Sequence, residues 1–183
     1  DIRLTPSQNL AFCGVSDAQK EKIQSILDDN GVAGPEKLSG LRKNALACPA
    51  LPTCGLALSE SERFIPELLD AFERVLDEAG LSDDQISIRM TGCPNGCARP
   101  YLAEIGLIGK APGKYNLYLG AAYEGTRLNT IYKESITSEE IVPTVAPLLM
   151  SYAKDRQDGE RFGDYCVRAG IVSPPSKYTV GQD

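Results

Sequence analysis

The chain has 183 residues, of which 42% are apolar and 24% are charged, as in ordinary globular proteins. The net charge of −6 and the scattered basic residues argue against binding to nucleic acid, and no apolar run reaches the roughly 18 residues that span a membrane. Histidine is absent, which excludes Ser-His-Asp and Cys-His catalysis and any imidazole ligand. A metal site in this chain must therefore use cysteine and carboxylate ligands.

The first predicted element is a helix over residues 17–29. Ser16 and Gln19 have the spacing of a capping box, which satisfies backbone N–H groups at a helix start. Its apolar residues recur at helical spacing: Ala18, Ile23, Ile26 and Leu27. A loop marked by glycine and proline follows over 31–40, and a shorter helical stretch is expected to lead into Cys48.

A second helix is predicted behind a capping box formed by Ser59 and Glu62. Pro66 is expected to bend or restart this helix, and Gly80 is expected to end it. Its apolar residues again have helical spacing: Phe64, Leu68, Leu69, Phe72, Val75 and Leu76.

The hydrophobic period then changes to the alternation of strands. Three strands are predicted: ISIRM (86–90), AEIGLIGK (103–110) and YNLYLG (115–120). A helix over 138–157, capped by Ser138, and a late strand over 164–170 follow. Because helices alternate with strands, the expected fold class is α/β or α+β, with a central mixed sheet flanked by helices and the cysteine loops at one end of the sheet.

The sequence is expected to form one domain over residues 1–172. The segment 173–183 is rich in proline and polar residues and is expected to be a poorly ordered tail. Because the chain opens on DIRLTPSQNL, without an initiating Met or a signal sequence, we expect it to be a fragment of a longer protein.

Four of the six cysteines form two close pairs, Cys48-PALPT-Cys54 and Cys93-PNG-Cys97. Four thiolates supplied as two pairs suit an iron–sulfur cluster or a structural zinc ion. Five residues between two ligands are unusual for zinc, and nearby glycines let backbone N–H groups approach a cluster sulfur. The spacing favours a [4Fe–4S] cluster, while zinc and reduced structural thiols remain open.

The remaining cysteines, Cys13 and Cys166, lie in apolar surroundings and are expected to pack as small hydrophobic residues. Cys97 falls where a helix over GCARPYLAE is expected to begin. The positive end of a helix dipole lowers the pKa of a thiol, which would favour Cys97 as a ligand.

The segments ACPALPTCGLALSESERF (47–64) and RMTGCPNGCARPYLAEIGLIGKAPGKYNLYLG (89–120) resemble the sirohaem-dependent assimilatory sulfite and nitrite reductases. The resemblance extends to LTPSQNLAF, RLNTIYKESIT and FGDYCVRAGIV, and so it covers nearly the whole chain. Within this family the chain is most similar to the carboxy-terminal, cluster-binding half of the hemoprotein (β) subunits of NADPH-dependent sulfite reductases.

The resemblance implies that Cys48, Cys54, Cys93 and Cys97 hold one [4Fe–4S] cluster, and that Cys97 is also the axial ligand of the sirohaem iron. It implies the six-electron reduction of sulfite to sulfide. The alternatives are a sirohaem nitrite reductase, which forms ammonia, and a non-catalytic iron–sulfur electron-transfer module. No catalytic residue is expected in this chain, because the family binds its substrate through Arg and Lys of the amino-terminal half. The fragment is expected to be inactive without that half.

The same resemblance implies a cytoplasmic protein with three partners: sulfite, the amino-terminal half of the hemoprotein and an NADPH-dependent flavoprotein reductase subunit. Thr91 and Asn95 flank the cysteine ligands, and each is expected either to hydrogen-bond a cofactor or to shape the turn. Sirohaem carries eight carboxylates, which need basic partners. Five basic residues near the cysteine motifs are candidates for neutralising the carboxylates, with ordinary solvated charge as the alternative for each: Arg42, Lys43, Arg89, Arg99 and Lys110.

Overall fold

The computed structural model describes residues 1–32 and 34–175. The chain divides into two compact units, Asp1–Ser39 and Gly40–Asp183, where the sequence predicts one domain over 1–172. Residues 176–183 of the predicted tail lie outside the described part.

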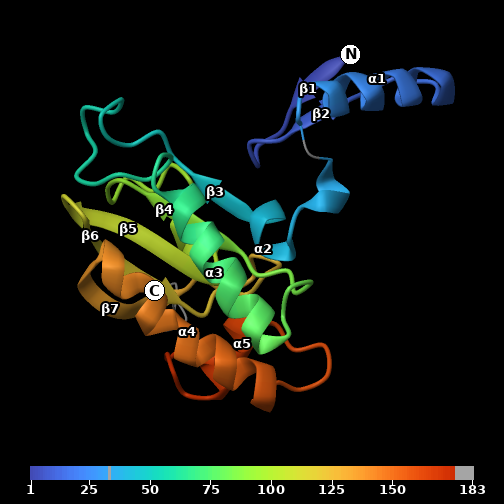
Figure 1. The fold of residues 1–183 in the computed structure, drawn as a ribbon. Helices are drawn as coiled ribbons and strands as arrows, with labels where there is room; N and C mark the ends of the chain where they lie inside the picture. The colour runs from blue at the N-terminus through green and yellow to red at the C-terminus, as the bar shows by residue number, and fades with distance from the viewer. Residues whose placement is uncertain (33, 176–183) are drawn as a thin grey trace, which may run out of the picture. The chain divides into compact units, whose positions relative to one another are not determined.

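The first unit combines a short hairpin with one helix (Figure 1). Strands β1 (Ile2–Leu4) and β2 (Leu10–Phe12) pair antiparallel, and α1 (Asp17–Asp29) has the predicted bounds. The capping box is confirmed, because the Ser16 N–H donates to the side-chain oxygen of Gln19 at 3.0 Å. No residue of α1 is buried, and Ile23 and Leu27 of its apolar stripe line a groove of about 600 Å³ within this unit. The unit ends with a short 3-10 helix, η1 (Pro35–Lys37).

The second unit is built on a five-stranded mixed sheet in the order β3-β4-β5-β6-β7 (Figure 1). Neighbours among the first three strands are parallel, and β6 and β7 join antiparallel. The strands are β3 (Ala45–Ala47), β4 (Ile88–Thr91), β5 (Ile105–Ala111), β6 (Lys114–Leu119) and β7 (Thr130–Thr137). The expected mixed sheet is therefore confirmed.

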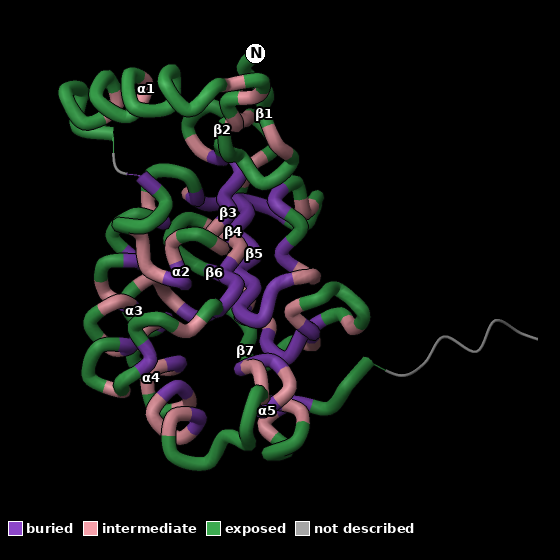
Figure 2. The backbone as a smooth tube through the Cα atoms, turned by 90° about the vertical axis from the view of Figure 1, so that its right-hand side faces the viewer, coloured by how far each residue is buried: buried purple, intermediate pink, exposed green. Residues whose placement is uncertain are grey.

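One face of the sheet is covered by helices (Figure 1; Figure 2). The helices of this unit are α2 (Gly40–Lys43), α3 (Ile65–Ala79), α4 (Ser138–Asp155) and α5 (Phe162–Arg168). The core residues come from alternate positions of the strands, such as Ile88 and Met90 of β4, and from the facing stripes of α3 and α4. Burial of such side chains stabilises each by about 1.5–3 kcal/mol, which makes this layer the main core.

The two long helices of this unit begin differently from the sequence prediction. Phe64 is the N-cap of α3, and Ser59 is buried in the preceding loop, so the predicted second capping box does not form. Pro66 lies in the first turn, where a missing N–H costs nothing, and therefore starts the helix without bending it. Gly80 ends α3 in the left-handed conformation, as predicted. The N-cap of α4 is Thr137 and not Ser138.

Two further predictions of local structure are wrong. Residues 162–168 form α5 and not a strand, because Phe162, Tyr165 and Cys166 have helical spacing and all three are buried. No α-helix begins at Cys97: only a 3-10 helix, η2 (Pro100–Leu102), follows it. The argument that a helix dipole activates Cys97 therefore does not hold.

Candidate metal centre

The two cysteine pairs lie at the same edge of the sheet. Cys48 directly follows β3, and Cys93 follows the end of β4 by two residues. Because β3 and β4 are parallel, their carboxyl ends meet at one edge. The Cys48 N–H donates to the Met90 carbonyl at 3.2 Å and continues the ladder into the loops. The predicted position of the cysteine loops at one end of the sheet is confirmed.

Gly92 is the point where the two loops touch. Its carbonyl accepts from the Leu58 and Ser59 N–H groups at 2.7 and 3.0 Å. Its own N–H donates to the Cys48 Sγ at 3.3 Å. A Cβ at this position would lie 2.6 Å from both the Ala50 Cβ and the Ser59 carbonyl oxygen. Only glycine lets the loops approach this closely.

A small apolar cluster joins the segments that carry three of the cysteines. Its members are Leu46, Cys48, Ala50 and Ala98, with Ala57 packed against them. Ala50 and Ala57 lie on either side of Cys54 in the sequence, and Ala98 directly follows Cys97. The loop residues on both sides of the candidate site are thus packed together.

The four cysteines differ in exposure. Cys48 and Cys93 are buried, Cys54 is half-buried and Cys97 is exposed, and each is a free thiol. Among residues 1–32 and 34–175, no three cysteine or carboxylate side chains are gathered so that they could hold a metal ion. The structure thus brings the two pairs into contacting loops without gathering their sulfurs.

The donor set fits an iron–sulfur cluster. Thiolates are its usual ligands, and a backbone N–H already points at one sulfur, from Gly92 to Cys48. The Thr91 hydroxyl beside the second pair is buried and has no hydrogen-bond partner among the described residues. A buried hydroxyl without a partner costs about 1–3 kcal/mol, so a further acceptor at this position would be stabilising.

The five basic candidates have different surroundings. Arg42 is engaged between α2 and α3, because its guanidinium lies 2.6 Å from carboxylate oxygens of both Asp70 and Glu73. Arg89 and Arg99 are linked, since the Arg89 Nη1 donates to the Arg99 carbonyl at 3.4 Å. Lys43 and Lys110 are exposed. The Arg89–Arg99 pair adjoins Cys97, whereas Arg42 serves helix packing.

The sequence analysis missed a buried carboxylate, Glu104, just before β5. One oxygen accepts from the N–H and the hydroxyl of Ser87 at 2.8 and 3.1 Å, and the other accepts from the Gly163 N–H at 3.0 Å. Burial raises the pKa of Glu104, and these hydrogen bonds offset part of the effect. Glu104 thereby ties α5 to the sheet. Its position in the sequence carries no signal that distinguishes it from a surface glutamate.

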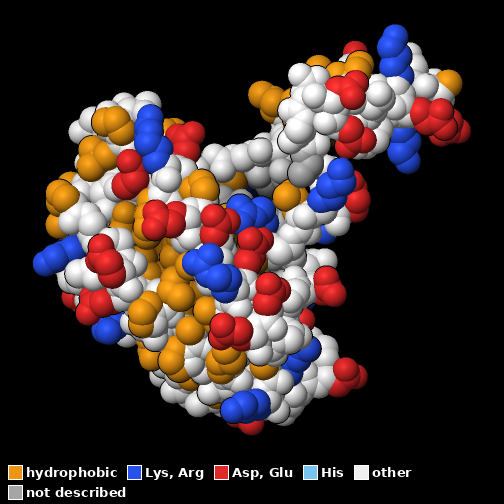
Figure 3. All heavy atoms as spheres, in the orientation of Figure 1, with side chains coloured by type: hydrophobic (Ala, Val, Ile, Leu, Met, Phe, Trp, Pro, Cys, Tyr) orange, Lys and Arg blue, Asp and Glu red, His pale blue; other side chains and the backbone are white. Residues whose placement is uncertain are grey.

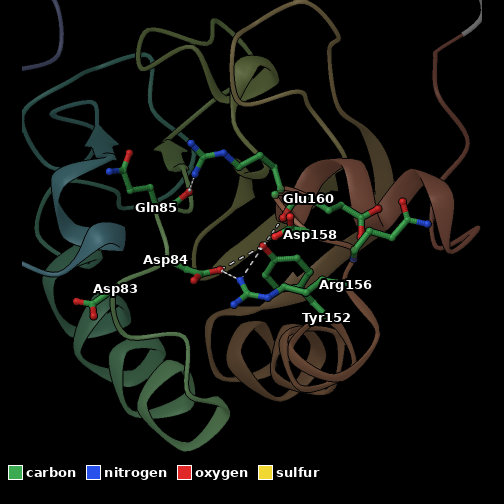
Figure 4. A pocket seen from close by; sticks show the side chains of 10 residues that line it. Asp83, Asp84, Gln85, Tyr152, Arg156, Asp158 and Glu160 are labelled. Carbon is green, nitrogen blue, oxygen red and sulfur yellow. Dashed lines mark hydrogen bonds and ion pairs between the residues drawn. The ribbon is translucent and has the colours of Figure 1, made fainter.

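A polar pocket of about 560 Å³ lies between the loop after α3 and the end of α4 (Figure 4). The Tyr152 hydroxyl donates to the Glu160 carbonyl at 2.7 Å and lies 3.2 Å from the Asp84 carboxylate, which also pairs with Arg156. The pKa of Tyr152 is raised, chiefly by burial. These contacts fasten the end of α4 and account for the polar side chains of this pocket.

The two remaining cysteines differ from one another. Cys166 is fully buried, as expected, and burial raises the pKa of its thiol to about 12. Cys13 is only half-buried, so the prediction that it is a buried hydrophobic residue is wrong.

Acidic and basic side chains intermingle over the face that carries α3 (Figure 3). In the described part of the chain, no helix combines the length and apolar character needed to cross a membrane.

No family model matches the chain. It is 54% identical over 183 residues to the "Sulfite reductase [NADPH] hemoprotein beta-component" of Staphylococcus haemolyticus, covering 100% of this chain and 31% of that protein. The protein of the same name from Geobacillus kaustophilus is 56% identical over 172 residues, which are 94% of this chain and 30% of that protein.

A solved structure, that of the Mycobacterium tuberculosis NirA protein, superposes with a TM-score of 0.77 at 26% sequence identity. The match covers 93% of this chain and 33% of that chain. The chain is therefore a relative, over its whole length, of the sulfite reductase hemoprotein beta-components, and it spans about a third of their length.

Proposed function

We propose that this chain is the part of a sulfite reductase hemoprotein that holds a [4Fe–4S] cluster through Cys48, Cys54, Cys93 and Cys97. The observation that carries the proposal is the contact at Gly92, which hydrogen-bonds the two cysteine loops together at one sheet edge. Because cluster binding and folding are coupled, the loops are expected to close their sulfurs around the cluster when it is inserted.

The surroundings of each thiol suit this role. Cys48 and Cys93 are buried at the base of the site, where the Gly92 N–H can stabilise a ligand sulfur and water is excluded. Cys97 is exposed, and we propose that its thiolate would also hold the iron of sirohaem. When bound, the two cofactors supply one-electron redox chemistry; the chain supplies ligands, position and a hydrogen-bonded, partly dry surrounding.

The proposed reaction is the reduction of sulfite to sulfide, which takes six electrons and six protons and releases three oxygen atoms as water. The name of the curated relatives favours sulfite over nitrite. The chain spans about a third of those relatives, and we propose that the residues that bind the substrate lie in the rest of the protein. An NADPH-dependent flavoprotein is the proposed electron donor. Six free cysteines fit a reducing compartment such as the cytoplasm.

The test is the metal content of the chain after anaerobic purification. We expect about four irons and four acid-labile sulfides per chain, and no zinc. Cys48→Ser should lose most of the iron. The matched control is Cys13→Ser, since Cys13 is a half-buried cysteine of the other unit. Stoichiometric zinc without iron, or equal iron in both variants, would overturn the proposed ligand set.

Cys97→Ser in the longer hemoprotein separates the enzyme from an electron-transfer module. In the enzyme, this substitution should abolish the sirohaem absorption bands or sulfite reduction, because it removes the thiolate that would hold the sirohaem iron. Unchanged sirohaem bands together with unchanged sulfite reduction would contradict the role of Cys97.

A further inference from the structure

The 3-10 helix η2, which begins three residues after Cys97, lies on the sheet face away from α3 and α4. Ile105 and Leu107 of β5 belong to the core beneath these helices, so Gly106 between them faces the other way. A Cβ at Gly106 would lie 2.5 Å from the Pro100 carbonyl oxygen. The backbone of η2 is therefore in direct contact with β5.

Asn129, which directly precedes β7, holds this segment through three hydrogen bonds. Its side-chain amide donates to the carbonyls of Pro100 and Ala103, each at 2.8 Å. Its backbone N–H donates to the Tyr101 carbonyl at 3.0 Å. The residue is 5% exposed, so water does not compete for these bonds. A single residue far away in the sequence thus fastens η2 to the sheet.

The same side chain carries an unsatisfied polar atom. The Oδ1 of Asn129 is buried and has no hydrogen-bond partner among the described residues. An unpaired buried acceptor destabilises the folded state, and a leucine, which has the same branched shape, would avoid this cost. The feature that distinguishes Asn129 from leucine at this position is therefore its pair of N–H donors, and both are used on η2.

The hold on η2 extends to the turn that contains Cys97. The Arg99 N–H donates to the Gly96 carbonyl at 2.7 Å, and a Cβ at Gly96 would lie 3.6 Å from the Tyr101 ring. Arg99 adopts the left-handed conformation, with φ 55° and ψ 52°. A residue with a side chain keeps this conformation only where its surroundings enforce it. The position of η2 therefore constrains the backbone next to Cys97.

The other neighbour of Cys97 is also held, because Ala98 is buried in the small apolar cluster with Cys48. The Cys97 side chain itself is exposed, unlike the buried Cys48 and Cys93, so its own packing does not fix it. We infer that Asn129 is a positioning residue, which sets the place of the Cys97 thiolate relative to the other cysteine ligands by clamping η2. This inference rests on the proposed function and deepens it, because it names a residue outside the cysteine loops that controls one proposed ligand.

The test is site-resolved labelling of the anaerobically purified, iron-loaded chain with iodoacetamide, read by mass spectrometry. A thiolate bound to iron is protected, so labelling reports how often a cysteine leaves its place. Asn129→Leu keeps the shape of the side chain and removes both donors. It should label Cys97 about tenfold faster, as expected for a lost hydrogen bond, while Cys48 and Cys93 stay protected. The electron paramagnetic resonance signal of the reduced cluster should broaden, because one ligand then varies in position.

The matched control is Asn44→Leu. The Asn44 amide also donates to a backbone carbonyl, that of Gly40 at 2.8 Å, but Asn44 directly precedes β3 and so lies at the end of this strand away from Cys48. This variant should leave Cys97 labelling and the resonance signal at the wild-type level, even where it lowers the melting temperature as much as Asn129→Leu does. Far-UV circular dichroism confirms that each variant is folded.

Wild-type labelling of Cys97 in Asn129→Leu would overturn the inference, as would equal labelling in Asn129→Leu and Asn44→Leu or a loss of iron from both variants. The proposed function fails separately, through the iron content of the wild-type chain. A wild-type chain without iron contradicts the ligand set and the inference with it. An iron-loaded chain in which Asn129→Leu leaves Cys97 protected disproves the positioning role alone.

Discussion

Replacing Gly92 with alanine is the sharpest perturbation of the contact between the cysteine loops. The added Cβ would lie 2.6 Å from the Ala50 Cβ and from the Ser59 carbonyl oxygen, well inside the 3.4 Å at which ordinary van der Waals contact begins. One of these neighbours is backbone, so no rotation of a side chain can relieve the clash. The loops must separate, which also weakens the hydrogen bonds from Leu58 and Ser59.

Overpacking of this kind costs about 1–3 kcal/mol of unfolding free energy. The lower entropy of an unfolded chain with alanine in place of glycine returns about 0.5 kcal/mol. For a protein of this size, each kcal/mol lowers the melting temperature by about 2–4 °C. Thermal unfolding and iron content of Gly92→Ala should therefore both decrease, because the same contact supports the fold and the ligand loops.

Gly55→Ala is the matched control, since Gly55 lies in the other cysteine loop, next to Cys54, and an added Cβ there meets no described atom within 4 Å. Its stability should stay within about 0.5 kcal/mol of the wild type, with full iron content. Wild-type stability and iron in Gly92→Ala would refute the argument from close approach. Equal damage in both variants would show that any added methyl group in these loops is harmful.

Three further predictions concern the scaffold around the site. Glu104→Gln should change the pH dependence of unfolding. Because the pKa of Glu104 is raised, its contribution to the unfolding free energy is greatest at low pH and decreases as pH rises above the ordinary carboxyl value of 4.5. The variant should therefore gain stability relative to wild type toward neutral pH, and a difference in unfolding free energy that stays constant with pH in urea titrations would contradict this. Asn129→Ala leaves two carbonyls without their donor and should lower the unfolding free energy by about 2–3 kcal/mol, with faster hydrogen exchange at η2 as the specific sign. Arg42→Gln should cost about 1 kcal/mol at low salt and less at 1 M salt, because its pair with Glu73 is only partly buried; the same loss at both salt concentrations would exclude an electrostatic origin.

The sequence predicts those elements in which the hydrophobic period and the cap or turn residues indicate the same secondary structure. The helix over 17–29 and the β5–β6 hairpin have a regular pattern and clear turn residues, and both occur in the structure. The segment 162–168 is predicted as a strand because its hydrophobic pattern is too short to distinguish a strand from a helix. Its helical spacing becomes clear only from the burial of its apolar residues in the same core as α4. Strand β7 is largely exposed, so it lacks the alternation that identifies a half-buried strand.

The candidate site was predictable to the level of its cysteine pairs. Their spacing indicated paired thiolate ligands, and the parallel strands before Cys48 and Cys93 explain why the pairs meet. The roles of Gly92 and Asn129 depend on contacts between segments far apart in the sequence, which no local pattern encodes. The same holds for Arg89 and Arg99, which the sequence offered only as two of five scattered basic residues.

The central claim, that these two cysteine pairs together hold one iron–sulfur cluster, is tested most directly by X-ray absorption at the metal edges of the anaerobic chain. The account predicts iron with sulfur-only ligation and a second shell of iron scatterers, and the loss of both in Cys93→Ser. Zinc bound by sulfur at about 2.3 Å, with no iron in the sample, would contradict it.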